Sequence, residues 1–140
     1  MKKLILLLFI PFVCYGQEDI ERYKVYNTTN IYTSLLLDSA TGRIWQLQIG
    51  VGDTDRLETV LSDRKLAKSI ETITKEWDKE MKPYALKEYI NERTVAKNGR
   101  FKLYPTDNNY NFIMVDVING NTYQVQWNTK SKKRFVSRFW

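Results

Sequence analysis

The sequence predicts a β-rich α+β protein built from two four-stranded antiparallel meander repeats, with a helical insert between them. The main observation is an internal duplication. Residues 21–49 and 99–127 align at a constant offset of 78 without a gap, and ten of the 29 aligned positions are identical. Unrelated segments would share about two, given a usage of roughly 5–7% for common residues. A repeat of this kind fixes the architecture more firmly than residue propensities do.

The strands of each repeat follow from alternation of apolar and polar residues, which is typical of a half-buried strand. Arg22–Tyr26 predicts the first strand, with Tyr23 and Val25 toward the core, and its counterpart starts at Arg100. In the third strand, Trp45, Leu47 and Ile49 share one face, which we expect to be the core face. Gln46 and Gln48 lie on the other, and the second repeat places Gln124 and Gln126 in the same way.

The second strand of each repeat differs, because Thr33–Asp38 and Asn111–Asp116 are nearly continuous apolar runs. Such runs are typical of a strand that is covered on both faces. Each run ends in an aspartate, followed four residues later by Gly42 or Gly120, which is hairpin-loop chemistry. A fourth strand is expected at 56–61 and 134–139.

A meander of this size has one apolar face and cannot bury it alone. We therefore expect the two repeats to face each other, as a sandwich or as a small closed barrel.

The insert, residues 62–91, predicts helix. Ser62–Lys82 has an amphipathic stripe, with Ser62 as the expected N-cap and Pro83 as the expected end. Tyr84–Asn91 predicts a second, shorter helix. We expect the stripe to pack on the β core or across an open barrel end. It consists of Leu66, Ile70, Ile73, Trp77 and Met81.

Residues 1–16 have the features of a secretory signal peptide. Lys2 and Lys3 precede a short apolar run, and small residues stand at the expected cleavage positions before Gln17. We therefore expect an exported protein of the periplasm or cell surface. Lipid anchoring at Cys14 is the less favoured alternative, because bulky Val13 precedes that cysteine.

The rest of the chain, residues 17–140, is expected to form one domain. Its parts are repeat one (21–61), the helical insert (62–91) and repeat two (99–139). No second apolar stretch predicts a membrane span.

The absence of histidine narrows the possible functions, and Cys14 is the single cysteine. Catalytic triads, zinc hydrolysis and haem ligation that need histidine are excluded. Asp38 and Asp116 lie at equivalent hairpin corners, where a structural role is expected. We therefore predict a protein that is not an enzyme and needs no cofactor or metal. A carboxylate-based glycosidase is the minor alternative. The net charge of +6 is modest, and no nucleic-acid partner is expected.

Polar positions that are identical in both repeats predict a partner-binding face, since exposed sheet positions are usually free to diverge. Cross-strand stabilisation is the alternative explanation. We expect this face to bind another envelope or surface protein. The candidates are Arg22, Lys24, Tyr26, Gln46, Gln48, Arg100, Lys102, Tyr104, Gln124 and Gln126.

Tyrosines near strand ends support a second hypothesis, a glycan-binding module. Aromatic rings beside threonine and asparagine suit sugar stacking. The residues are Tyr26, Tyr32, Tyr104 and Tyr110.

The loops before the fourth strands differ in charge. Asp53-Thr54-Asp55 in repeat one corresponds to Ser131-Lys132-Lys133 in repeat two. Solvated hairpin tips would explain both loops, and head-to-tail association between copies is the alternative.

The segments LLLDSATGRIWQ and RFKLYPTDNNYNFIMVDVINGNTYQVQW resemble a repeat of short exported Bacteroidota proteins. Its pattern is approximately R-[YF]-x-L-[YF]-P-T-x-N-x-[YW]-x-F-x-x-L-D-x-x-T-G-x-x-W-Q-V-Q. Repeat one departs at Asn27, and repeat two at Asn119 and Tyr123. The resemblance implies export but no activity, and it assigns no site residue.

Overall fold

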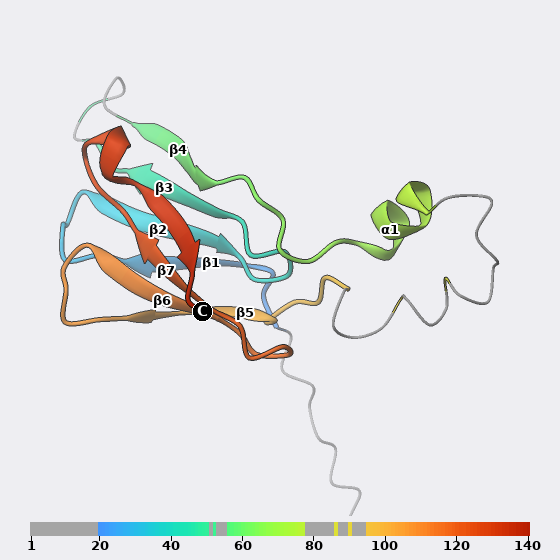
Figure 1. Ribbon diagram of the computed structural model, residues 1–140. Coiled ribbons are helices and arrows are strands. Elements are labelled where there is room, and N and C mark those ends of the chain that lie inside the picture. Colours follow the sequence, from blue (N-terminus) through green and yellow to red (C-terminus); the bar gives the residue numbers. More distant parts are fainter. Residues whose placement is uncertain (1–19, 51, 53–55, 78–85, 87–89, 91–94) are drawn as a thin grey trace, which may run out of the picture.

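The computed structural model describes residues 20–50, 52, 56–77, 86, 90 and 95–140 (Figure 1). Each repeat forms one four-stranded antiparallel sheet, in which the strands follow sequence order. The first sheet contains β1 (Tyr23–Asn27), β2 (Thr33–Asp38), β3 (Ile44–Gln48) and β4 (Leu57–Ser62). The second contains β5 (Phe101–Pro105), β6 (Asn111–Asp116), β7 (Thr122–Gln126) and β8 (Phe135–Arg138), with a 3₁₀ turn at Ser131–Lys133 before β8.

The duplication extends to the pairing of the strands. The partners recorded across β1–β2 and β2–β3 reappear 78 residues later, and so do all but one of those across β3–β4. Gln48, for example, pairs with Leu57, and Gln126 pairs with Phe135. The predicted two-meander architecture is therefore confirmed.

The loops after β2 and β6 have the expected hairpin chemistry. Gly42 and Gly120 have φ angles of 78° and 71°, in the left-handed region that favours glycine. The Asp38 carboxylate accepts hydrogen bonds from the Ala40 backbone N–H and the Thr41 hydroxyl, as aspartate does in such turns.

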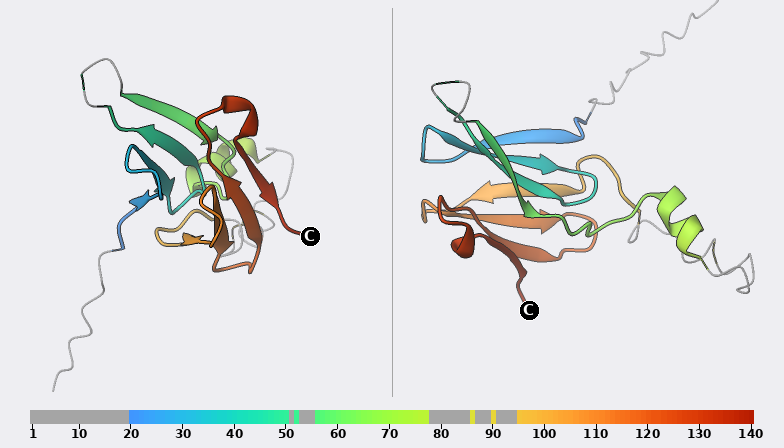
Figure 2. Two further views of the ribbon diagram at one scale, coloured as in Figure 1. Left: turned by 90° about the vertical axis from the view of Figure 1, so that its left-hand side faces the viewer. Right: turned by 90° about the horizontal axis from the view of Figure 1, so that it is seen from above.

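The two sheets pack face to face as a sandwich (Figures 1 and 2). The arrangement is sandwich-like and not a closed barrel. Apolar side chains from both sheets form the core. Its strand residues are Leu35, Leu37 and Ile44 from the first sheet, and Phe101, Leu103, Phe112, Met114, Tyr123 and Val125 from the second.

The two repeats bury opposite faces. The aromatic face is the set Tyr23, Val25, Leu36, Trp45 and Leu47 in repeat one, and Phe101, Leu103, Met114, Tyr123 and Val125 in repeat two. The glutamine face is the set Lys24, Tyr26, Leu35, Leu37 and Gln46 in repeat one, and Lys102, Tyr104, Ile113, Val115 and Gln124 in repeat two. The core lies between the aromatic face of repeat two and the glutamine face of repeat one.

The prediction for the core face is therefore right for repeat two and wrong for repeat one. Tyr23 and Val25 were expected in the core, but they are 50% and 60% exposed. The reason is geometric. When two equivalent sheets stack without one of them being turned over, the aromatic face of one meets the glutamine face of the other. Strand β2 permits this, because Leu35 and Leu37 supply a second apolar face beside Leu36.

The helical insert also differs from the prediction. Strand β4 continues through Ser62, and helix α1 spans only Ile70–Glu76, with Ser69 as its N-cap. The helix stands away from both sheets beyond one end of the sandwich (Figures 1 and 2). The expected packing of the stripe on the β core is therefore wrong for Ile70 and Ile73 on the helix and confirmed for Leu66, which packs against the core.

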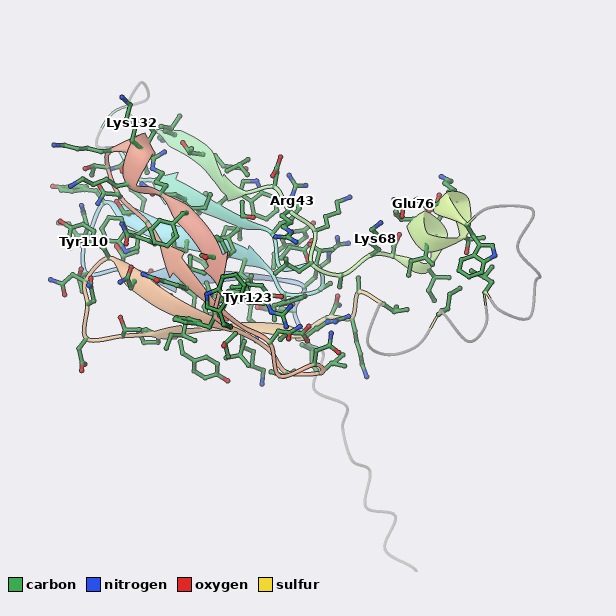
Figure 3. All side chains as sticks on the ribbon, in the orientation of Figure 1. Arg43, Lys68, Glu76, Tyr110, Tyr123 and Lys132 are labelled. Atoms are coloured by element: carbon green, nitrogen blue, oxygen red, sulfur yellow. The ribbon has the colours of Figure 1, made fainter. Side chains whose placement is uncertain are left out.

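Polar contacts stabilise α1 and the preceding residue Lys68, which forms an isolated parallel bridge with Val95. The Ser69 hydroxyl accepts from the Thr72 N–H, and Lys68 forms an ion pair with Glu76 (Figure 3). The Ala96 N–H donates to the Lys68 carbonyl oxygen. The predicted end at Pro83 and nearly all of the predicted helix 84–91 lie outside the described residues.

Candidate functional site

The aromatic face of repeat one is an exposed apolar surface. In repeat two the same positions are buried, so repeat one presents to solvent a face of the kind that elsewhere in this chain forms core. Leu36, Trp45 and Leu47 at its centre are half-buried. On β4, Val60 pairs with Trp45 and extends the surface.

Aromatic and arginine side chains cluster on this surface. The rings of Tyr23 and Trp45 lie 6.5 Å apart between centroids and are tilted by 55°. The Arg43 guanidinium lies 4.8 Å from the centre of the Trp45 ring, and that of Arg22 lies 5.2 Å from the Tyr23 ring. These distances suit cation–π attraction, which holds the cluster in shape. Tryptophan, tyrosine and arginine are also the residues that dominate binding energy at protein interfaces.

The structure corrects several members of the predicted partner-binding face. Arg100 was expected to point outward, but its side chain is only 1% exposed. It donates to both carboxylate oxygens of Asp116, at 3.1 and 2.8 Å, and to the Val95 carbonyl oxygen at 2.7 Å. Gln46 and Tyr26 are also turned inward: Gln46 is buried, and Tyr26 packs against the core.

Arg22 makes the equivalent pair in repeat one. Its guanidinium donates to both oxygens of Asp38, at 3.2 and 3.0 Å, while remaining 50% exposed. Burial raises the pKa of Asp38, but hydrogen bonds from Arg22, Thr41 and Ala40 outweigh burial and hold that pKa below its usual value. The hydrogen bond to Asp38 in turn raises the pKa of Arg22. Arg22 therefore ties the hairpin loop to the start of β1.

The remaining candidates lie mostly on the outer glutamine face of repeat two. Lys102 and Tyr104 are exposed there, and Gln124 and Gln126 are half-buried. The Gln126 side chain donates to the Lys133 carbonyl oxygen. In repeat one, Gln48 is half-buried and accepts a hydrogen bond from the Thr33 hydroxyl, which stabilises neighbouring strands.

Lys24 and Lys102 are brought together across the two repeats. Both line a hollow of about 350 Å³, together with Lys97 and the apolar side chains of Ile20 and Val117. A basic rim of this kind favours an acidic partner surface.

The four tyrosines of the glycan hypothesis do not share one environment. Tyr32, Tyr104 and Tyr110 are about half exposed, whereas Tyr26 packs against the core. Figure 3 places Tyr110 at the end of the sandwich far from α1. One side of its ring is occupied by Trp127, at 5.1 Å between centroids.

A small polar hollow of about 200 Å³ lies between the two repeats at their β1–β2 and β5–β6 turns. Amide and hydroxyl side chains form most of its wall, with Phe112 and Pro105 as apolar neighbours. Amides and hydroxyls are groups that orient a sugar. The hydrophilic lining members are Asn27, Thr28, Thr29, Thr106, Asn108, Asn109 and Asn111.

The carboxylates of the described residues show no metal arrangement. Among these residues, no group of three or more His, Cys, Asp or Glu side chains could hold a metal ion. Asp38 and Asp116 each face their own arginine and their own loop N–H groups. In the part of the chain that the structure describes, no helix is long and apolar enough to cross a membrane.

Sequence reasoning missed Tyr23, Val25, Trp45 and Arg43 as surface residues. The same core face was expected in both repeats, which assigned Tyr23, Val25 and Trp45 to the core and left Arg43 out. The continuous apolar run of β2 was the available signal, because it indicated that both faces of the first sheet need cover.

Comparison of the chain with known protein families, with curated proteins and with solved structures finds no match. A hypothesis about the function therefore depends on the geometry of this chain.

Proposed function

We propose that the protein is a non-enzymatic interaction module of the cell envelope or cell surface. Its docking surface is the exposed aromatic face of repeat one, flanked by Arg22 and Arg43. Export follows from the signal peptide that residues 1–16 predict.

One observation carries this proposal: an apolar sheet face, equivalent in position to the core face of repeat two, is open to solvent in repeat one. Contiguous exposed apolar surface on a folded domain marks an interaction site. The Tyr23, Trp45 and Arg43 cluster gives such a surface the residue types of a binding hot spot. Leu36 and Leu47 are already half-buried. A partner would therefore mainly need to cover the exposed side chains of Tyr23, Val25 and Val60.

The test is a cross-linked pull-down of the tagged, exported protein from native envelope. Val25→Lys should remove a discrete protein partner, because it places a charge within the apolar surface, at its most exposed strand residue on β1. The matched control is Ile31→Lys, at a residue that is also strongly exposed but lies in the β1–β2 turn. Both changes should alter the free energy of unfolding by no more than about 0.5 kcal/mol, as surface substitutions usually do.

Equal recovery of the partner with both variants would overturn the proposal. Recovery of polysaccharide without protein would favour the second candidate, glycan binding at the Asn- and Thr-lined hollow. In that case Asn108→Ala should reduce recovery and Val25→Lys should not.

A further inference from the structure

The internal interface of the chain shows what kind of surface covers an aromatic face. The aromatic face of repeat two, centred on Met114 and Tyr123, is covered by the glutamine face of repeat one. Among the residues that the structure describes, the stack leaves one face of each kind uncovered: the aromatic face of repeat one and the glutamine face of repeat two. The two free faces are therefore equivalent to the two faces that already pack together.

We infer that the protein associates with a second copy head to tail, so that the aromatic face of repeat one packs on the glutamine face of repeat two of the next copy. This inference rests on the proposed docking surface and names its partner. An association of this type is heterologous, since each copy contributes a different face.

The free glutamine face of repeat two is apolar enough to serve as the partner. Ile113 and Tyr104 are exposed there, and Val115 is half-buried. In repeat one, their equivalents Leu35 and Leu37 are fully buried, and Tyr26 packs on the core. On β8, Phe135 is exposed at the edge of the same sheet.

The pattern of identities between the repeats agrees with a shared contact role. Of the identical pairs on strands, four lie on the glutamine side of the sheets: Lys24/Lys102, Tyr26/Tyr104, Gln46/Gln124 and Gln48/Gln126. In repeat one these positions face repeat two. Their identity in repeat two, where they lie on the outer face of the sandwich, is expected if that face also packs on a sheet.

Some residues that make contacts in the internal interface have equivalents on the free faces that make no such contact among the described residues. The Asn128 N–H donates to the buried Gln46 side-chain oxygen, whereas the equivalent Gln124 is half-buried on the outer surface. Phe101 packs against Gly42, at 3.3 Å from the position of an added Cβ. At the equivalent Gly120, among the residues that the structure describes and apart from its two chain neighbours, no heavy atom lies within 4 Å of that position. In the proposed assembly, Tyr23 of the next copy would cover Gly120.

A complementation experiment separates this arrangement from symmetric dimers. Val25→Lys blocks the aromatic face of repeat one, and Ile113→Lys blocks the glutamine face of repeat two. Sedimentation velocity of the exported full chain should show concentration-dependent association for the wild type. Each variant alone should remain monomeric, and an equimolar mixture should form a dimer of twice the monomer mass and nothing larger. Circular dichroism should show the wild-type fold for both.

Three results would overturn the inference. A wild type that stays monomeric at high concentration would refute self-association. If it still captured an envelope protein through Val25, the proposed function would stand without it. Self-association of Ile113→Lys alone would indicate a symmetric contact between aromatic faces, and that of Val25→Lys alone a symmetric contact between glutamine faces.

Discussion

Replacing Arg100 with methionine should destabilise the protein far more than the same change at Arg22, although the two arginines are equivalent in sequence and make the same pair. Arg100 and Asp116 have side chains only 1% and 2% exposed. Without the guanidinium, the Asp116 carboxylate keeps backbone N–H donors from Ile118 and Asn119 but no cation. Removing one member of a buried ion pair costs about 3–5 kcal/mol.

Arg22→Met is the matched control. The Arg22 side chain is half exposed, so in the variant water can replace some of the hydrogen bonds that the guanidinium donates to Asp38. Solvent also screens the charge of the Asp38 carboxylate. The loss in the free energy of unfolding should be about 1 kcal/mol. The free energy of unfolding of a natural domain is only about 5–15 kcal/mol. Arg100→Met should therefore leave the protein close to unfolding, whereas Arg22→Met should not.

The assay is urea denaturation at neutral pH, followed by tryptophan fluorescence. Arg100→Lys, which keeps the charge but loses the two-pronged geometry, should fall between wild type and Arg100→Met. Equal losses for Arg22→Met and Arg100→Met, or a loss below about 1 kcal/mol for Arg100→Met, would refute the assignment of a buried structural role to that arginine.

Two further predictions concern the hairpin loops. Asp38→Asn should lower the free energy of unfolding by about 1–3 kcal/mol at pH 7. Because the folded-state pKa of Asp38 is lowered, its contribution is fully present above its unfolded pKa of about 3.9 and is lost as the pH falls through the folded value. The difference in the free energy of unfolding between wild type and Asp38→Asn should thus be constant from about pH 5 to 7 and disappear below about pH 4. A difference that persists in acid would contradict this reasoning. Gly42→Ala and Gly120→Ala should both cost about 1 kcal/mol for the left-handed conformation, as measured by thermal melting. Gly42→Ala should cost more, since its Cβ would lie 3.0 Å from Leu66, whereas the Cβ at Gly120 would meet no described residue beyond its chain neighbours within 4 Å; equal losses would contradict the packing described at Gly42.

The architecture was predictable from sequence because the duplication repeats both the strands and their pairing. Alternation fixed the strands to within one or two residues, and Asp38 and Gly42 marked the hairpin loop. The helix was overestimated because the spacing of Leu66, Ile70 and Ile73 fits a helix. However, Leu66 lies in a bend between β4 and α1 and packs on the core, and tertiary packing outweighs periodicity over so short a stretch.

The site was less predictable. Alternation separates the two faces of a strand, but it cannot say which face is buried when both are apolar, as in β2. The burial of Gln46 and Arg100 depends on repeat two and on the segment at Val95, which are distant in sequence. Two of the positions that are identical between the repeats, Tyr26 and Gln46, make internal contacts in repeat one.

The central claim is that equivalent faces of the two repeats are used differently, one inside the sandwich and the other as a docking surface. Thiol labelling of Val25→Cys and Leu103→Cys tests it most directly, because these residues occupy equivalent positions at 60% and 4% exposure. Cys14→Ser makes the introduced cysteine the single thiol. Val25→Cys should label rapidly in dilute protein and more slowly as the concentration rises, whereas Leu103→Cys should be protected at every concentration. Equal protection of both positions in dilute protein would contradict the account.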